Sequence, residues 1–134
     1  MGLNNEERQI MVSLEVEKAD KLMKEAEDIA HLKHWDAVAN RLYYAAFHAV
    51  SALLIKNQHP VGTHKGAIMT FGNFFVKTGL VSKEDGRIYS QLQTLRESGD
   101  YNCYIETTEE EIVPMIEKTK SFIALIKQLM GDKQ

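Results

Sequence analysis

Apolar residues recur along most of this chain at the three- and four-residue spacing of α-helices, and no segment predicts a β-hairpin. From Asn4 to about Lys33, charged residues fill the positions between the apolar ones, which predicts a long amphipathic helix. The apolar stripe of this helix consists of Met11, Leu14, Leu22, Ala26 and Ile29. The segment from about Trp35 to Lys56 is apolar on almost every face, which is typical of a central, mostly buried helix.

A third helix is predicted after a loop at Asn57–Gly62, which contains a proline and a glycine. Thr63 can cap this helix, which runs from His64 to about Lys77. Gly79 follows at the place where a left-handed residue is expected. The apolar stripe of the third helix consists of Ile68, Phe71, Phe74 and Phe75.

Capping motifs mark the last two helices. The fourth opens at Ser82-x-x-Asp85, which resembles a capping box. Its apolar residues are Ile88, Leu92 and Leu95. The fifth helix ends near Met130. It begins either at the caps Thr107 or Thr108, or near Pro114, because a proline inside a helix removes a hydrogen bond.

Five helices with short joins predict an all-α fold, an up-and-down antiparallel helical bundle that forms one domain over residues 1–134. The 16 Lys and Arg residues against 19 Asp and Glu residues give a net charge of −3. This charge argues against electrostatic binding of nucleic acid over the whole protein surface. The longest mainly apolar stretch, Leu42–Ile55, is about 14 residues and too short for a membrane span. Cys103 is the single cysteine and cannot form an internal disulfide, so we expect a cytoplasmic protein without a membrane segment.

The sequence holds no motif for a metal or a cofactor. Its histidines do not show the His-Glu-x-x-His spacing of a helical zinc site, and no glycine-rich phosphate loop is present. We therefore expect no metal and no cofactor.

The second predicted helix carries the first candidate site, in the segment Asn40–His48. Arg41 and His48 are seven residues apart, so they lie two turns apart on nearly the same face, with Tyr44 between them. An arginine in so apolar a helix needs an acceptor, either on a phosphate or carboxylate ligand or on an internal carboxylate such as Asp100. His48 also has two interpretations, a hydrogen-bonded core histidine or a ligand or base.

The second candidate site is the segment Arg96–Tyr101. Arg96 and Asp100 have the i, i+4 spacing of a helical ion pair, provided that the helix persists through Gly99. In the other interpretation, Arg41 and Arg96 offer two guanidinium groups to one anion, and nucleotide phosphates suit such a pair.

These two segments resemble the HEPN family of small α-helical domains. The resemblance rests on the run Arg41–Ala49, on His64 at the start of the third helix, and on Arg96-x-x-Gly99-Asp100-Tyr101, and it extends over about Leu14–Leu129. It implies an up-and-down bundle that pairs into a homodimer. It also implies partnership with a minimal nucleotidyltransferase, in many cases as a toxin–antitoxin pair.

Many HEPN proteins are metal-independent ribonucleases with an Arg-x(4–6)-His motif late in the bundle. Arg96 stands at that place, but no histidine follows it at the required spacing. An aspartate such as Asp100 cannot donate a proton like an imidazolium at neutral pH without a large pKa shift. Arg41-x(6)-His48 has the letters of the motif, but on the central helix. We therefore expect a protein that does not cleave RNA.

The leading hypothesis is a non-catalytic, dimeric HEPN domain that binds a nucleotide or an adjacent nucleotidyltransferase. The expected site residues are Arg41, Tyr44, His48, His64, Arg96, Asp100 and Tyr101. A second hypothesis is an RNA-cleaving toxin that uses Arg41 and His48, or Arg96 together with His48 of a partner chain. A third is a structural dimerisation module whose arginines form internal ion pairs.

Overall fold

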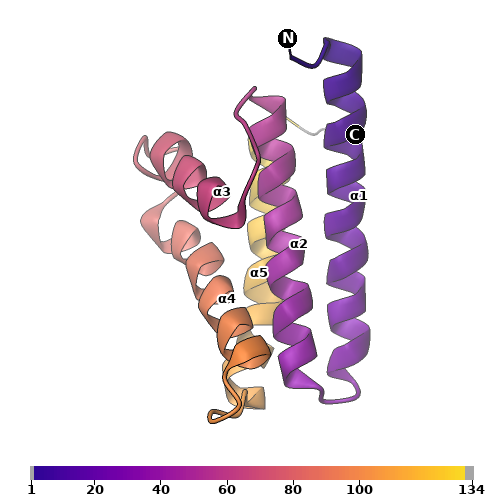
Figure 1. Ribbon diagram of the computed structural model, residues 1–134, viewed down its shortest axis with the longest axis vertical. Helices are drawn as coiled ribbons and strands as arrows, with labels where there is room; N and C mark the ends of the chain where they lie inside the picture. The colour runs from indigo at the N-terminus through magenta and orange to yellow at the C-terminus, as the bar shows by residue number, and fades with distance from the viewer. Residues whose placement is uncertain (1, 132–134) are drawn as a thin grey trace.

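Five α-helices and one π-helical turn make up most of the described part of the chain, residues 2–131, in the computed structural model (Figure 1). Their bounds are α1 Asn5–Ala30, α2 Trp35–Lys56, α3 His64–Phe71, η1 Gly72–Val76, α4 Lys83–Tyr101 and α5 Glu109–Leu129. No strand occurs within these residues, so the predicted all-α class is confirmed. Figure 1 shows α1, α2, α4 and α5 alternating in direction along the long axis, with α3 at an angle to them. Residues 1 and 132–134 of the predicted domain lie outside the described range.

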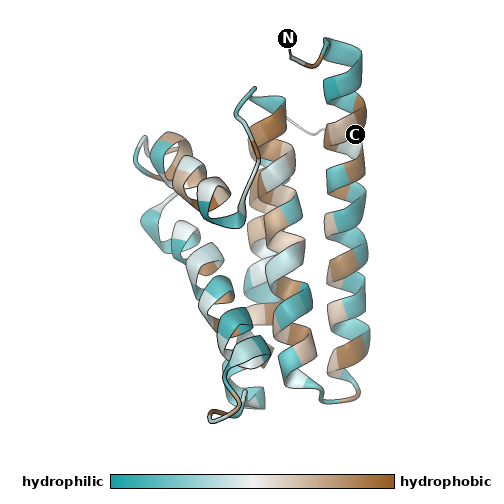
Figure 2. Cartoon of the chain, in the orientation of Figure 1, coloured by the Kyte–Doolittle hydropathy of each residue, from teal (hydrophilic) through white to brown (hydrophobic). Residues whose placement is uncertain are grey.

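α2 is the centre of the bundle because its sequence is apolar on nearly every side. Leu42, Val50 and Leu53 are fully buried, and α1, α4 and α5 all pack against this helix. Figure 2 shows apolar residues along α2 and a mixture of apolar and polar residues along α1. The predicted central, buried helix is thus confirmed. Neither α2 nor another helix within residues 2–131 is long and apolar enough to cross a membrane.

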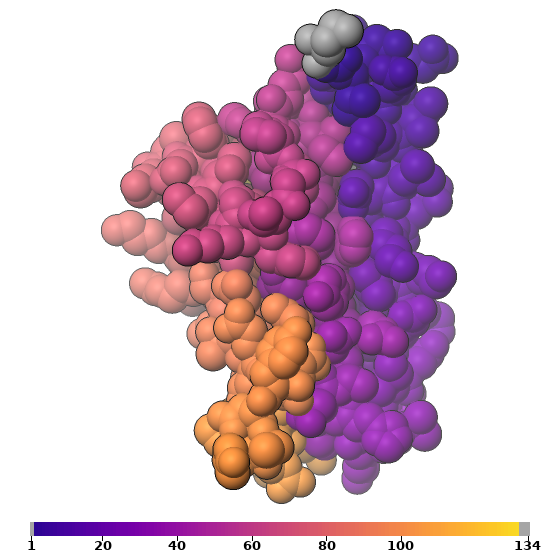
Figure 3. All heavy atoms as spheres, in the orientation of Figure 1, coloured from indigo at the N-terminus to yellow at the C-terminus, as the bar shows by residue number. Residues whose placement is uncertain are grey.

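The predicted apolar stripe of α1 is correct in its C-terminal half and wrong in its N-terminal half. Leu22 and Ala26 are buried as predicted, but Met11 and Leu14 are exposed. The residues that face the bundle in their place are Val12, Val16 and Ala19. These positions continue the three- and four-residue spacing back from the buried half, so the rotation of the helix decides which residues are covered, whatever their size. Figure 3 shows α1 along one whole side of the molecule.

The predicted third helix is divided into α3 and the π-helical turn η1. In η1 the Lys77 N–H donates to the Gly72 carbonyl oxygen at 2.9 Å, five residues back. Phe71 and Phe75 are both buried, with ring centroids 5.9 Å apart. Phe74 is 51% exposed, so its assignment to the buried stripe is wrong. A π turn holds more residues than an α turn and so rotates less per residue, which moves Phe74 off the face that the other two rings share.

Side-chain caps fix the starts of three helices where the sequence predicts them. The hydroxyls of Thr63, Ser82 and Thr108 each accept a hydrogen bond from the backbone N–H three residues further on, at 2.9, 3.0 and 3.3 Å. Of the alternatives for α5, Thr108 is therefore the cap, in place of Thr107 or a start at Pro114. Pro114 lies inside α5 on its exposed side, where water can replace the hydrogen bond that the ring removes.

Candidate functional site

Arg96 is a cation buried on the inner face of α4. It is only 9% exposed. Three tyrosine rings surround its guanidinium, whose Cζ lies 5.0 Å from the ring centroid of Tyr43, 5.6 Å from that of Tyr44 and 5.7 Å from that of Tyr101. Such cation–π contacts offset part of the hydration that the cation has lost. We name Arg96, these three tyrosines and the adjacent His64 the Arg96 cluster.

The protein satisfies the polar groups of Arg96 incompletely. The predicted i, i+4 pair with Asp100 is present, because α4 continues through Gly99. Its Nη1–Oδ2 distance is 3.6 Å, which is longer than a hydrogen bond. Nε is buried and has no hydrogen-bond partner among residues 2–131. Buried N–H donors nearly always have a partner in folded proteins, so the unpartnered Nε–H of Arg96 is an exception within the cluster.

Asp100 is held by α2 as well as by Arg96. Its Oδ2 accepts a hydrogen bond from Asn40 Nδ2 at 3.1 Å. Asn40 Oδ1 in turn accepts one from Arg41 Nη1 at 2.9 Å. Asn40 therefore competes with Arg96 for the carboxylate and orients it. Asn40 was not among the predicted site residues.

Arg41 points towards α1. Its Nε pairs with Glu25 Oε1 at 3.0 Å, and the two side chains are 38% and 37% exposed. The interpretation of Arg41 as one half of an internal ion pair is right in kind, but the partner is Glu25 and not Asp100. The structure thus gives Arg41 and Arg96 different carboxylates on different helices.

His48 lies on the same face of α2 as Arg41, as their spacing predicts, and it also contacts α1. Its Nδ1 lies 2.6 Å from Glu15 Oε1. The His48–Glu15 and Arg41–Glu25 pairs therefore join α1 to α2. Both residues of the predicted alternative catalytic pair are engaged by carboxylates of the same neighbouring helix.

His64, the first residue of α3, brings an imidazole to the tyrosines. Its Nδ1 lies 3.0 Å from the Tyr43 hydroxyl. Its ring centroid lies 4.3 Å from that of Phe47 and 5.5 Å from that of Tyr44. Partial burial lowers the pKa of His64 below its usual value, and the charge of Arg96 lowers it further. The ring is therefore neutral at neutral pH and carries one N–H donor.

Tyr43 is the residue at the centre of the cluster that the sequence did not single out. It is fully buried, contacts both Arg96 and His64, and stacks on Tyr89 with the ring centroids 6.0 Å apart. Burial raises the pKa of the Tyr43 hydroxyl, so the ring is neutral. The two adjacent tyrosines, Tyr43 and Tyr44, were the feature of the sequence that could have indicated a site. The helix period, however, assigns Tyr43 to the core.

Tyr101 connects the cluster to a hollow at the end of α4. Its side chain is 76% exposed. The hollow has a volume of about 530 Å³ and is lined by Asp36 and residues 99–106. A Cβ on Gly99 would lie 3.1 Å from Asp36 Oδ1 and 3.3 Å from Thr107 Oγ1, so glycine allows the end of α4 to pack closely on α2. A hollow of this size accommodates a small molecule.

The sequence of this chain is similar to a known domain family and to several known proteins. The model of the HEPN domain family matches residues 12–129. A UPF0332 protein of Thermotoga maritima is 38% identical over 96 residues, which cover 72% of this chain and 73% of that protein. The protein named "Putative toxin MJ0605" of Methanocaldococcus jannaschii is 40% identical over 98 residues, which cover 72% of this chain and 71% of that protein. A UPF0332 protein of Archaeoglobus fulgidus is 28% identical over 120 residues, which cover 90% of this chain and 95% of that protein.

Proposed function

Because the chain belongs to the HEPN domain family, we propose that it is a non-catalytic HEPN domain that binds a nucleotide at the Arg96 cluster. One observation carries the proposal: the Nε–H of the charged Arg96 is buried without a hydrogen-bond partner in the described chain. A phosphate oxygen is a strong acceptor for such a donor, because the charge and the planar geometry of a guanidinium both match it.

The groups around Arg96 suit the rest of a nucleotide. Tyr101 presents an exposed aromatic ring on which a base can stack. His64 is neutral, and its Nε2 can donate or accept a hydrogen bond according to the tautomer. The carboxylate of Asp100 can accept a hydrogen bond from an amino group of a base, a group that inorganic phosphate lacks. A nucleotide therefore fits the cluster better than inorganic phosphate does.

Calorimetric titration of the purified protein tests the proposal. The ligands are the four common nucleoside monophosphates, the matching nucleosides and inorganic phosphate, all at one ionic strength. At least one nucleotide should bind about tenfold more tightly than its nucleoside, because a charge-assisted hydrogen bond contributes about 1.5–3 kcal/mol. Equal binding of nucleotide and nucleoside would contradict the role of Arg96. Absence of binding by all the nucleotides would favour the structural dimerisation module.

We further propose that the domain acts beside a minimal nucleotidyltransferase in a toxin–antitoxin-type pair. Membership of the HEPN family supports this, as do two relatives from Methanocaldococcus jannaschii whose names contain the word toxin. A nucleotidyltransferase gene next to the gene for this chain, with copurification of the two products, is the expected result. A neighbourhood without such a gene would contradict it.

RNA cleavage is the second candidate function, because His64 brings a neutral imidazole to the tyrosines that surround Arg96. A metal-independent ribonuclease needs a proton shuttle beside the cation that stabilises the transition state. In this chain Nδ1 of His64 is engaged by the Tyr43 hydroxyl, which leaves Nε2 to transfer a proton. We favour binding over cleavage because no histidine follows Arg96 at the spacing of the ribonuclease motif.

Incubation of the purified protein with a generic RNA should leave the RNA intact on a denaturing gel. Cleavage that is lost in His64→Ala would assign the chemistry to the Arg96 cluster. Cleavage that is lost in His48→Ala would assign it to Arg41 and His48. Either result would overturn the proposal of a non-catalytic domain.

A further inference from the structure

A groove, which we name the η1 groove, lies between α4 and the continuous segment of α3 and η1, on the far side of α2 from α1 (Figure 1). Its volume is about 450 Å³, which is in the range of small-molecule sites. Ile68, Met69 and Val76 line it on one side, and Tyr89 of α4 lines it on the other. The wall formed by α3 and η1 is therefore mainly aliphatic.

Two glycines shape the η1 groove. A Cβ on Gly86 of α4 would lie 2.9 Å from Cγ2 of Val76, so α4 and η1 meet closely at that point. A Cβ on Gly72, which also lines the groove, would meet no heavy atom of residues 2–131 within 4 Å. The backbone of Gly72 has φ −60° and ψ −45°, which any residue adopts in a right-handed helix. Glycine at position 72 therefore leaves open space and is not required by the backbone.

The π-helical turn forms part of the aliphatic wall. The first and last residues of η1, Gly72 and Val76, both line the η1 groove. Turns of this kind are rare and occur frequently at functional sites. The turn is thus an observation, separate from the size of the groove, that points to a function here.

Three cations also line the η1 groove. Lys77, Lys83 and Arg87 are exposed, and none of them forms an ion pair within residues 2–131. Glu84 and Asp85 follow Lys83 in the sequence, but neither is among the residues that line the groove. Interactions within the described chain therefore leave the positive charge of the groove uncompensated.

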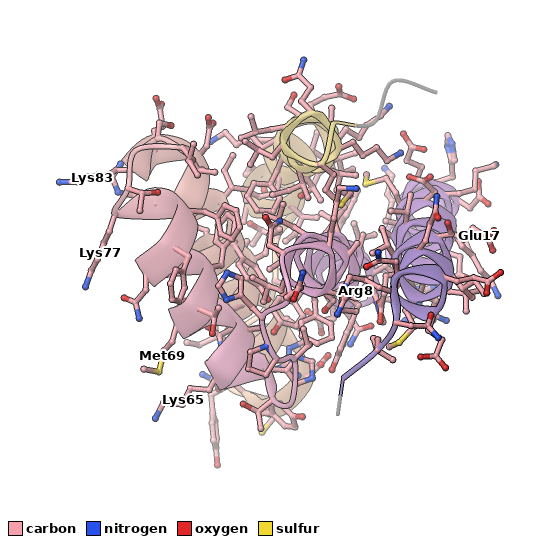
Figure 4. All side chains as sticks on the ribbon, turned by 90° about the horizontal axis from the view of Figure 1, so that it is seen from above. Arg8, Glu17, Lys65, Met69, Lys77 and Lys83 are labelled. Atoms are coloured by element: carbon pink, nitrogen blue, oxygen red, sulfur yellow. The ribbon has the colours of Figure 1, made fainter. Side chains whose placement is uncertain are left out.

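The cations gather at one end of the η1 groove. Lys77 follows η1 and Lys83 begins α4, so both lie beside the turn that joins the two elements, and Arg87 lies one helical turn further along α4. Ile68 and Met69 lie towards the other end, about 13 Å away at 1.5 Å per residue. Figure 4 shows Lys77 and Lys83 directed outwards at one edge of the molecule, with Met69 further along the same edge. The groove is thus basic at one end and apolar at the other.

We infer that the η1 groove binds a small amphipathic anion, an aliphatic carboxylate with its chain on the apolar wall and its head group among the three cations. Burial of the chain removes apolar surface from water on both sides of the contact. Met69 has a flexible, polarizable side chain that adapts to the shape of a ligand. The carboxylate accepts charge-assisted hydrogen bonds from lysine and arginine, which supply the charge that the groove lacks.

Other occupants fit the η1 groove less well. A nucleic acid would use the cations, but its phosphates and sugars gain little from an aliphatic wall. An uncharged apolar molecule would leave the three cations without a partner. A protein partner buries about 800 Å² of each surface in a stable interface, which extends well beyond a groove between two short elements.

Calorimetric titration of the full chain with hexanoate, octanoate and decanoate, at neutral pH and below the concentrations at which they form micelles, tests the site. Affinity should rise by up to about fourfold for each added methylene, because one buried methylene contributes about 0.8 kcal/mol. Octan-1-ol should bind more weakly than octanoate, and octylamine more weakly still. Equal affinities for the three carboxylates, or for octanoate and octylamine, would overturn the proposal.

Gly72→Leu tests the position of the chain, because it places a side chain in the η1 groove. The helical backbone and the open space at this position allow leucine, so the variant should fold and should bind decanoate at least tenfold more weakly. Gly62→Leu is the matched control, since it makes the same change at an exposed glycine that does not line the groove. Circular dichroism checks the fold of both variants. Unchanged affinity in Gly72→Leu would contradict the site.

The triple variant K77Q/K83Q/R87Q tests the position of the head group. It should weaken decanoate binding about tenfold, because an exposed ion pair changes affinity by up to about fivefold. Its affinity for octan-1-ol should remain that of the parent. Lys65→Gln is the control, because Lys65 lies on the same edge in Figure 4 but does not line the groove. A triple variant that binds decanoate as tightly as the parent would contradict the role of the cations.

The η1 groove does not rest on the proposed nucleotide site, so the two can fail separately. Arg96→Gln should leave decanoate binding unchanged. Loss of decanoate binding in Arg96→Gln but not in Gly72→Leu would place the carboxylate at the Arg96 cluster and overturn the proposal. A parent that binds none of the carboxylates would also overturn it. If that parent binds RNA through the three cations, or self-associates and becomes monomeric in Gly72→Leu, the groove belongs to that occupant instead.

Discussion

Replacing Arg96 with glutamine should weaken nucleotide binding about tenfold to a hundredfold while the bundle remains folded. The substitution removes a buried cationic donor that has no protein partner at Nε within residues 2–131. A charge-assisted hydrogen bond to a phosphate contributes about 1.5–3 kcal/mol, which sets the size of the loss. Calorimetry with the nucleotide that binds the parent most tightly measures it, and the melting temperature checks the fold.

Arg41→Gln is the matched control for Arg96→Gln. Arg41 pairs with Glu25 of α1, so its removal should change nucleotide affinity by less than about twofold. The pair is more than one-third exposed, so its loss should lower the free energy of unfolding by about 1 kcal/mol or less. Equal loss of affinity in both variants would instead support one anion held by both arginines. If Arg96→Gln melts below the assay temperature, Arg96→Lys takes its place. This variant keeps the charge but lacks the planar Nε donor, so it should bind the nucleotide more weakly than the parent.

Replacing Phe122 with alanine should lower the free energy of unfolding by about 3–5 kcal/mol. The Phe122 side chain is 1% exposed and joins α5 to two other helices. Its ring centroid lies 5.8 Å from that of Phe71 and 6.1 Å from that of Tyr89. These buried neighbours are themselves packed, so they cannot fill the cavity that the ring leaves. Urea denaturation followed by circular dichroism measures the loss.

Phe74→Ala is the control for the core variant, because it deletes the same ring from an exposed position. Phe74 packs on His59 with the ring planes tilted and the ring centroids 4.3 Å apart, at the surface of η1. Its removal should cost about 1 kcal/mol or less, since surface substitutions rarely cost more. A loss as large as that of Phe122→Ala would contradict the rotation that the π turn imposes on this segment.

The helices were predictable from the sequence because caps and periodicity act over a few neighbouring residues. Thr63, Ser82 and Thr108 each cap a helix start through the N–H three residues on, a contact fixed by local geometry. The π turn could not be predicted in this way. Its hydrogen bond from Lys77 to Gly72 accompanies the burial of aromatic rings against other helices. The spacing of apolar residues within one segment does not predict that packing.

The sequence predicted which residues belong to the site better than it predicted which side chains pair with one another. Arg96 and Asp100 belong to one helix, so their spacing alone predicts their pair. The partner of Arg41 depends on how α1 and α2 rotate against each other, which the sequence of either helix does not fix. Tyr43 has the sequence pattern of a core residue. A ring that packs beneath a guanidinium is as buried as one that packs against leucine, so the pattern does not distinguish a site tyrosine from a core tyrosine.

The proposed nucleotide binding depends on one buried group, the Nε–H of Arg96. NMR observes arginine Nε–H groups directly in nitrogen-15-labelled protein. The Arg96 resonance is assigned by its absence in Arg96→Lys. During titration with the nucleotide, we predict that this resonance shifts and saturates at the concentration that calorimetry gives, while the Nε–H of Arg41 stays in place. A nucleotide that binds by calorimetry and leaves the Arg96 resonance unmoved would contradict the Arg96 cluster as its site.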